Sequence, residues 1–443
     1  WLKAQRTNLG HGTICGKKPV CEECLLRHML SLSVSTLSGQ TFVASVQPDT
    51  LLLRVQEEIA QGLGVPNWRV ALLHGDVVLH SDETVDEAHL EEASLLTALV
   101  HSPTLLVVGS VRAVKLWDID AGLVVQPMGG QREEDLLNIA FAADGKHVLL
   151  DYKHLIEVWD IERAASLFTL HHRRCSGSTS SFSTDASVIV TFNCSESVPE
   201  AFLLRVQDGS VKQTCPHESQ VLCAVIACQP EDAASCKEPV VFATGSKDGL
   251  VRVWSSDSCE CRLVLQGHGS YVGCVLFAPD GKRLLSASGD RTTRMWDTQS
   301  GECCYRLPGF HSMVAAYSFL PSGASFLSCG GDPFVKLWDT ATGNCIRTLH
   351  AGGGLVSTAI VSKDGEAIVT TTFNGKVMLW RDSRCLWSDE HDMSVVSAAF
   401  LSDDSKVAVG DASSIRILNA ETGQVLCTLD HNEGPALHLK SKP

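Results

Sequence analysis

A short phrase that recurs along most of this chain constrains its fold more than any other feature. Six copies place Trp, usually followed by Asp, at the end of a run such as VKLW, and two copies carry Leu instead of Trp. The two Leu copies are aligned by a Gly five residues later. The eight anchors, as we call the Trp or Leu positions, are Trp117, Trp159, Leu204, Trp254, Trp296, Trp338, Trp380 and Leu418. Their spacings of 42, 45, 50, 42, 42, 42 and 38 residues indicate one structural unit repeated along the chain.

The interior of each repeat predicts four short strands. In the fifth repeat, YVGCVLF, RLLSASG, TTRMWD and CCYRLP are separated by turn residues such as Asp280-Gly281. A sheet of this kind must bury both faces against its neighbours, which favours a closed ring of sheets. The Trp-Asp endings resemble the WD repeat, so we predict a mainly β fold with a WD-repeat β-propeller over residues 101–443. Eight anchors indicate eight blades, with seven as the alternative, and residues 435–440 are expected to complete the first blade.

The resemblance to WD-repeat proteins implies that the recurring polar residues are structural. In that family His, Ser or Thr, Asp and Trp form a hydrogen-bond network inside a blade, because a buried indole N–H and a buried imidazole both need partners. The best match is His268, Ser286 or Ser288, Asp290 and Trp296. The same structural role is expected for Asp248, Trp254, Asp332, Trp338, Trp117, Trp159 and Trp380.

A His, a Ser and an Asp also suggest a hydrolase triad, but their recurrence in successive repeats favours the structural role. The sequence contains no G-x-S-x-G elbow and no glycine-rich phosphate loop. We therefore predict no enzymatic activity, no catalytic residue and no cofactor.

Loops at one rim of the expected ring are the natural place for partner contacts. Aromatic side chains and Arg in such loops suit protein-binding hot spots, although each is also an ordinary loop residue. The candidates are Lys247, Tyr271, Arg291, Phe310, Phe334 and Phe373.

Residues 29–100 predict a separate α+β domain. A hairpin around Ser38-Gly39 precedes a helix opened by Asp49 or Thr50, and two more strand candidates follow. STLSGQTF, PDTLLLRVQEEIAQGLGVP and LLHGDVVL resemble the first turn, the helix with its exit and the third strand pair of ubiquitin. We expect a ubiquitin-like domain that is not conjugated, because Val100 continues into further chain without a terminal Gly-Gly.

The ubiquitin resemblance implies an apolar face that binds proteins of the ubiquitin and proteasome systems. Leu37, Leu72 and either Ala98 or Leu99 would occupy this face. The alternative is that these residues pack against the propeller.

Residues 1–28 form an irregular leader that we interpret as not necessarily native. The chain begins with Trp1, so a fragment, a processed product and a misplaced start are all open, with Met29 as a candidate start. Cys15, Cys21, Cys24 and His28 are candidate zinc ligands, since two Cys two residues apart, a third Cys and a His complete a tetrahedron. The alternative is a leader without metal.

The net charge and the cysteine content limit the kinds of partner and the cellular compartment that we expect. The formal net charge is −15, and residues 29–100 hold ten acids against two arginines. This balance argues against binding to nucleic acids or to a membrane surface, and the acidic segment is either a solvated face or a surface for a basic partner. The 18 cysteines lie largely in apolar runs, which indicates reduced, buried thiols in a cytoplasmic or nuclear protein.

We therefore expect a non-enzymatic scaffold or adaptor whose partners are other proteins, with its oligomeric state left open. The propeller would hold a client and the ubiquitin-like domain would dock a second protein. One alternative is a ribosome-assembly factor, since the Notchless family shares this domain order. The other is the C-terminal regulatory part of a larger NTPase or kinase.

Overall fold

The chain divides into two compact units, which are described separately. The N-terminal unit is Trp1–Ser102 and the C-terminal unit is Pro103–Pro443. The computed structural model describes residues 30–36, 40–63, 65, 69–74, 77–79, 83–90, 94–100, 104–110, 113–120, 122–128, 135–171, 180–193, 199–227, 241–258, 260–308, 316–391, 394–411, 413–430 and 436–442. The leader at 1–28 lies outside these residues.

The N-terminal unit packs one helix against a five-stranded mixed sheet. Its elements are β1 Leu30–Thr36, β2 Thr41–Val46, α2 Leu52–Leu63, β3 Val70–His74, β4 Val77–Leu79 and β5 Leu95–Val100. The strand order is β2-β1-β5-β3-β4, in which only β1 and β5 are parallel. The helix buries Leu52, Val55 and Ile59, which recur at helical spacing, against the inward residues of the sheet.

The start of helix α2 differs from the sequence prediction. The helix begins at Leu52, and the Leu52 amide donates to the carbonyl oxygen of Glu83 instead of to a side-chain cap. The Thr50 hydroxyl accepts a hydrogen bond from the Gln47 amide, so it stabilises the turn before the helix. The first turn of the helix is therefore stabilised by a backbone hydrogen bond to the segment around Glu83.

The described residues of the C-terminal unit form eight four-stranded antiparallel sheets, as many sheets as there are anchors. Sheet 1 joins β37 Ala436–Ser441 to β6 Leu105–Ser110, β7 Val114–Asp118 and β8 Leu123–Met128. Sheet 2 is β9 Leu136–Phe141, β10 His147–Tyr152, β11 Leu155–Asp160 and β12 Ala165–His171. Sheet 3 is β13 Ser181–Phe182, β14 Val188–Asn193, β15 Glu200–Arg205 and β16 Val211–Pro216. Sheet 4 is β17 Val221–Ile226, β18 Val241–Ser246, β19 Val251–Ser255 and β20 Cys261–Leu265.

The remaining four sheets repeat this pattern. Sheet 5 is β21 Val272–Phe277, β22 Arg283–Ser288, β23 Thr292–Asp297 and β24 Cys303–Pro308. Sheet 6 is β25 Ala316–Phe319, β26 Ser325–Cys329, β27 Phe334–Asp339 and β28 Cys345–His350. Sheet 7 is β29 Val356–Val361, β30 Ala367–Thr372, β31 Lys376–Arg381 and β32 Arg384–Glu390. Sheet 8 is β33 Ser397–Phe400, β34 Lys406–Gly410, β35 Ser414–Asn419 and β36 Val425–Asp430.

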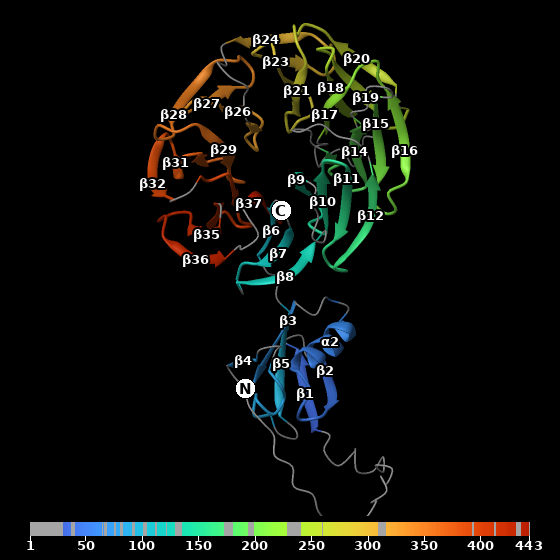
Figure 1. Ribbon diagram of the computed structural model, residues 1–443, viewed down its shortest axis with the longest axis vertical. Helices are drawn as coiled ribbons and strands as arrows, with labels where there is room; N and C mark the ends of the chain where they lie inside the picture. Colours follow the sequence, from blue (N-terminus) through green and yellow to red (C-terminus); the bar gives the residue numbers. More distant parts are fainter. Residues whose placement is uncertain are drawn as a thin grey trace, which may run out of the picture. The chain divides into compact units, whose positions relative to one another are not determined.

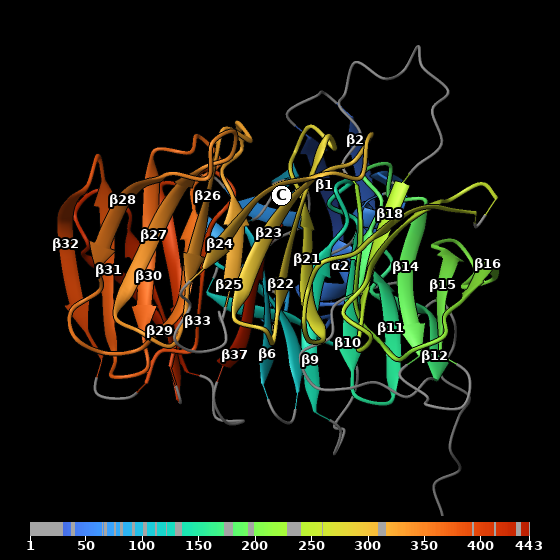
Figure 2. The ribbon, with the colours of Figure 1, turned by 90° about the horizontal axis from the view of Figure 1, so that it is seen from above.

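The sheets follow one another around a propeller-like ring, with the first strand of each sheet innermost (Figures 1 and 2). Each sheet contacts the next through strands or side chains, and sheet 8 contacts sheet 1 through β33, β34 and β37. Strand β37 comes from the C-terminal end of the chain and pairs with β6. This pairing supplies the inner strand that the sequence left missing from the first repeat.

Each anchor has the same place in its sheet. All eight lie on the third strand, and at every anchor the pairing with the fourth strand shifts register. Five residues after the anchor, a Gly with positive φ turns the chain in five of the sheets, at Gly122, Gly209, Gly301, Gly343 and Gly423. Anchor, bulge and turn together set the start of the outer strand.

Candidate functional site

The polar set predicted in the fifth repeat meets inside sheet 5. His268 contacts Ser286 Oγ through Nε2 at 2.8 Å and Asp290 Oδ2 through Nδ1 at 3.1 Å, and Trp296 Nε1 donates to Ser286 Oγ at 2.7 Å. Of the two serine candidates, Ser286 is the one that joins this network, while Ser288 Oγ donates to the Ser270 carbonyl oxygen.

The charges of this network suit a structural role. Burial lowers the pKa of His268 below its usual value, although Asp290 opposes this effect. Burial also opposes ionisation of Asp290, but hydrogen bonds from Gly269, Thr292 and His268 outweigh it and hold the pKa of Asp290 well below its usual range. The imidazole is fully buried, and each of its nitrogens already has a partner. Ser286 is fully buried and already accepts the Trp296 indole, which suits a structural network.

The anchor indoles of the other sheets divide into two groups. Trp254, Trp338 and Trp380 donate to Thr244, Ser328 and Thr370, which occupy the position of Ser286. Trp159 donates to Glu157 Oε2 at 3.2 Å, and the buried Trp117 Nε1 has no hydrogen-bond partner among the described residues. The strand register places Val108 and Leu150 where a hydroxyl would be needed, which explains the difference.

Among the described residues, neither Asp248 nor Asp332 contacts a histidine through a hydrogen bond. Asp248 accepts hydrogen bonds from Ser246 and Arg252, and Asp332 accepts one from the Phe334 amide. His217 of sheet 4 instead contacts the Cys215 carbonyl oxygen and Thr244. The full four-residue network among the described residues is that of sheet 5.

The candidate contact residues lie at one end of the sheets, beside the turns that join second and third strands. Lys247 and Arg291 are exposed, and Arg291 has a positive φ of 64°. Tyr271 and Phe334 are each 37% exposed and Phe373 is 51% exposed. Phe310 lies outside the described residues. Leu355, which the sequence analysis missed, belongs with this set because it is 52% exposed and its carbonyl oxygen accepts the Phe373 amide.

The predicted apolar face of the N-terminal unit needs a correction. Leu72 and Ala98 are buried in its core, so the prediction that they lie on an exposed face is wrong. Residues of a strand alternate between faces, and the run at 70–73 is apolar on both, which left its register open in the sequence. Leu37 and the Leu99 side chain lie outside what the structure describes.

The outer face of that sheet carries other apolar residues. Val43 is 69% exposed and Leu95 is 73% exposed, and both pair with Ser33 of the strand between them. They form an exposed row across β2, β1 and β5. Ala44 and Val46 are buried, so alternation along this strand places Val43 on the outer face. Apolar residues two apart at 44 and 46 were the sequence signal that could have found it.

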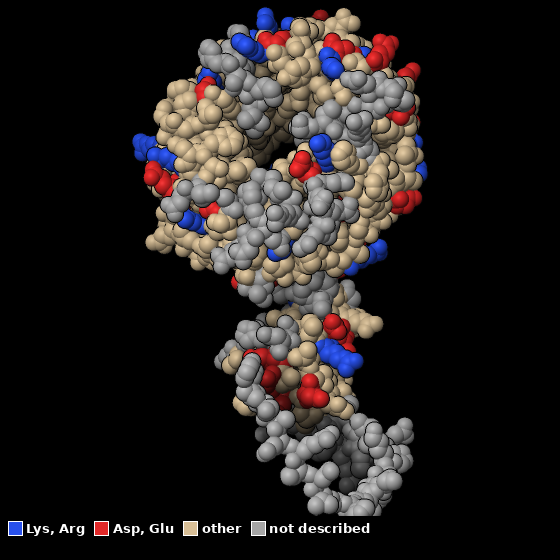
Figure 3. All heavy atoms as spheres, viewed as in Figure 1, with Lys and Arg blue, Asp and Glu red and all other residues tan. Residues whose placement is uncertain are grey.

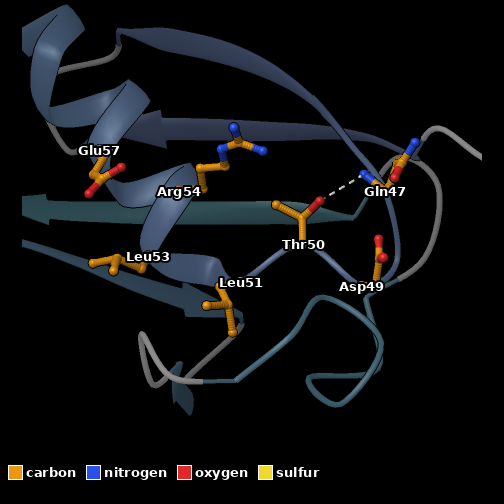
Figure 4. Close-up of a pocket in the computed structure, with 7 residues that line it drawn as sticks. All are labelled: Gln47, Asp49, Thr50, Leu51, Leu53, Arg54 and Glu57. Carbon is orange, nitrogen blue, oxygen red and sulfur yellow. Dashed lines mark hydrogen bonds between the residues drawn. The ribbon is translucent and has the colours of Figure 1, made fainter.

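A shallow pocket of about 330 Å³ lies where β2 leads into α2 (Figure 4). Its lining residues are Gln47, Asp49, Thr50, Leu51, Leu53, Arg54 and Glu57. The pocket combines two exposed leucines with charges of both signs, so its chemistry favours no one ligand.

The cysteines and the candidate metal ligands give a mixed outcome. Cys15, Cys21, Cys24 and His28 lie outside the described residues. Within the described part of the chain, no group of three or more His, Cys, Asp or Glu residues is placed to hold a metal ion.

Cys223 and Cys329 are buried as expected, but Cys261, Cys303, Cys345 and Cys385 are exposed because they lie on outer strands. Cys215 is disulfide-bonded, so the prediction of reduced cysteines is wrong there.

The charged side chains are scattered. On the face of the C-terminal unit shown in Figure 3, basic and acidic residues alternate without a continuous basic surface among the described residues. A helix long and apolar enough for a membrane span is not found in the part of the chain that the structure describes.

The geometry defines a protein with WD repeats, and comparison with known proteins agrees. Residues 209–255, 259–297 and 301–339 match the family described as "WD domain, G-beta repeat". Each match begins before the outer strand of one sheet and ends at the third strand of the next, so residues 209–339 contain three WD repeats that straddle successive sheets.

Individual relatives match over parts of their length. Nuclear distribution protein nudF 1 of Talaromyces marneffei is 38% identical over 97 residues, which is 21% of each chain. Nuclear distribution protein PAC1 of Mycosarcoma maydis is 41% identical over 56 residues, or 13% of this chain and 12% of that one. Autophagy-related protein 16 of Arabidopsis thaliana is 24% identical over 195 residues, or 43% of this chain and 35% of that one. The chain thus spans about a fifth of the nudF relative and about a third of the autophagy-related one.

Proposed function

We propose that this protein is a non-enzymatic interaction scaffold built from an eight-bladed WD-repeat propeller and a ubiquitin-like domain. The propeller holds a client protein and the ubiquitin-like domain docks a second partner, which we place in the ubiquitin–proteasome system. The proposal depends on a difference between the buried polar and the exposed apolar side chains of the repeat sheets. Their recurring polar residues are occupied by structural hydrogen bonds, while large apolar side chains remain exposed at the rim.

The similarity to nuclear distribution and autophagy-related proteins supports a role in protein assembly rather than in catalysis. The strand order of the N-terminal unit, with its parallel central pair and one helix, supports the ubiquitin-like assignment. We place the protein in the cytoplasm or the nucleus, with other proteins as its partners.

Proximity labelling with the full chain in its native cell tests the scaffold role. A reproducible set of neighbouring proteins is expected, and measured turnover without stable partners would contradict it.

The docking face of the ubiquitin-like domain has a sharper test. We place this face on the outer side of the sheet, so Leu95→Asp is expected to remove the partners of this domain. Val77→Asp is the matched control, because Val77 is 65% exposed but its register puts it on the opposite face. Equal loss from both variants would assign binding elsewhere.

A further inference from the structure

The exposed apolar side chains of the C-terminal unit fall into two groups. Among the described residues, seven lie on outer strands: Val124, Val211, Val264, Ile346, Leu386, Val425 and Leu426. The other four are Tyr271, Phe334, Leu355 and Phe373. These four all lie at the rim formed by the second-to-third-strand turns, in sheets 5, 6 and 7. We call them the rim patch.

Sheet 7 lacks the residues that fix the rim loop in sheet 5. Counting from the anchors, Gly352 stands where sheet 5 has His268, and Asn374 stands where it has Asp290. A side chain at Gly352 would collide with Lys376, whose chain lies over this position. Sheet 7 therefore has no His at this position, and the loop at 351–355 is held near the patch by backbone hydrogen bonds.

Two backbone hydrogen bonds and one ring contact bring Phe334, Leu355 and Phe373 together. The Phe373 amide donates to the Leu355 carbonyl oxygen at 3.0 Å, and the Ala351 amide donates to that of Pro333 at 2.9 Å. Phe334, which follows Pro333, packs edge-on against His350 with ring centroids 5.2 Å apart. Phe334, Leu355 and Phe373 thus lie around one loop, and at its centre Gly353 has open space beside it.

Acidic side chains lie near the patch. Asp290, Asp332, Asp389 and Glu390 lie on the turns and strand ends at this rim, together with Arg291 and Lys376. Asp389 is paired with Arg416 at 3.4 Å, so Asp332 and Glu390 are the acids considered for a ligand. The Glu390 side chain is 79% exposed, and its pairing with Lys376 at 3.6 Å leaves it open to a second cation. Such a rim complements a basic ligand and disfavours an acidic one.

We infer that the rim patch binds a basic protein segment that places an aromatic or aliphatic side chain between Leu355 and Phe373. Its Lys or Arg residues reach Asp332 and Glu390. The inference rests on the proposed scaffold role and adds to it the location and the chemistry of the client.

Selection from a phage-displayed random dodecapeptide library on the immobilised full chain tests this inference. The enriched peptides are expected to combine a large apolar residue with flanking Lys or Arg, and a synthetic copy should bind more weakly as salt rises from about 0.05 to about 0.5 M. Leu355→Ser and Phe373→Ser are each expected to weaken the synthetic peptide about tenfold. Ile346→Ser is the matched control, since Ile346 is 46% exposed on outer strand β28.

Each outcome decides the matter. Acidic or uncharged peptides, equal binding by the rim variants, or no enrichment would overturn the inference. Phe373→Trp should retain binding, which separates loss of the contact from misfolding, and unchanged melting temperatures confirm that the serine variants are folded. If proximity labelling recovers the same partners from wild type and rim variants, the scaffold role stands and the rim inference fails.

Discussion

At the scale of single residues, a left-handed turn five residues after six of the anchors affects local stability. Sheet 2 has Ala164 at this position with φ of 53°, where five other sheets have Gly. A left-handed backbone costs a residue with a Cβ about 1 kcal/mol more than it costs Gly, partly offset by the greater freedom of Gly in the unfolded chain.

We expect Ala164→Gly to raise the free energy of unfolding by about 0.5 kcal/mol. Ala164 is exposed, and its carbonyl oxygen, which accepts Gln126 Nε2, is kept in the variant. The reverse change, Gly122→Ala, meets no atom within 4 Å and should lower stability by about 0.5 kcal/mol through the same balance. Urea unfolding measures both, and a gain from Gly122→Ala would refute the argument.

The Trp117 indole, which finds no hydrogen-bond partner in the described part of the chain, predicts an unusual core substitution. Placing Thr for a buried Val normally costs about 1–2 kcal/mol, because the hydroxyl loses water. Val108→Thr should cost less than about 0.5 kcal/mol, since the new hydroxyl can accept from Trp117 Nε1. Val409→Thr is the control, because it occupies the same position in sheet 8, where the anchor is Leu418. Equal losses in urea unfolding would show that no hydrogen bond forms.

His217 predicts a pH dependence of stability. Burial lowers its pKa to about 4, while its unfolded value is about 6.5, so the unfolded chain binds more protons between these values. The stabilisation is complete above about pH 6.5 and declines as pH falls toward 4, by about 2–3 kcal/mol at pH 4.5. His217→Gln lacks this titration, so its stability deficit against wild type should shrink by that amount between pH 7 and pH 4.5. A constant deficit in denaturant melts would contradict the prediction.

At the scale of elements, the fourth strand of six sheets contacts the following sheet through the same position. This position lies two residues after the residue that pairs with the anchor. Gln126 donates to Ala164, Gln213 to Asp257 and Trp387 to Ala420, each to a carbonyl oxygen in the turn of the following sheet. Phe168, Leu263 and Tyr305 lie against Gly209, Gly301 and Gly343 in the same way. Neighbouring sheets are thus joined at their outer edges as well as in the core.

We expect Trp387→Ala to destabilise the C-terminal unit by about 3 kcal/mol. The indole packs where a Cβ at Gly423 would lie and donates to the Ala420 carbonyl oxygen at 2.9 Å. Leu386→Ala on the same strand is the control, and as Leu386 is 47% exposed it should change stability by less than about 0.5 kcal/mol. Thermal melts of both compare them directly, and similar losses would remove the special role of this position.

The sequence predicted the repeating elements well and the faces of individual residues less well. Trp, Asp and Gly at fixed offsets specify a bulge and a turn by their own chemistry, so the third strand of every sheet could be located. Leu72 was misplaced because Val70, Ala71, Leu72 and Leu73 are all apolar, and a strand with no alternation does not reveal its register. Leu355 was missed because exposure of a lone Leu after three Gly depends on the neighbouring sheet.

At the scale of the whole molecule, the C-terminal unit is stabilised by pairing between its first and last strands, β6 and β37. Ala436 and Leu439 of β37 are buried in the core shared by sheets 8 and 1. The Leu439 amide donates to Ser397 Oγ, and Lys406 pairs with Asp120 at 2.9 Å across the same junction. In a ring of repeats each sheet is stabilised by its neighbours, so loss of the contact between sheets 8 and 1 should lower the stability of all the sheets.

Removal of residues 436–443 from the full chain should therefore act on the entire C-terminal unit. It uncovers the inner edge of β6 and the apolar residues that β37 covers, at an expected cost of about 5 kcal/mol or more, comparable with the whole stability of many domains. We expect the truncated chain to lose its cooperative thermal transition and to self-associate in light scattering after size exclusion, whereas removal of Pro443 alone should change neither. A synthetic peptide of residues 435–443 should restore the transition in trans if pairing with β6 is what the segment contributes. A truncated chain that stays monomeric and melts as before would mean that the ring does not depend on this closure.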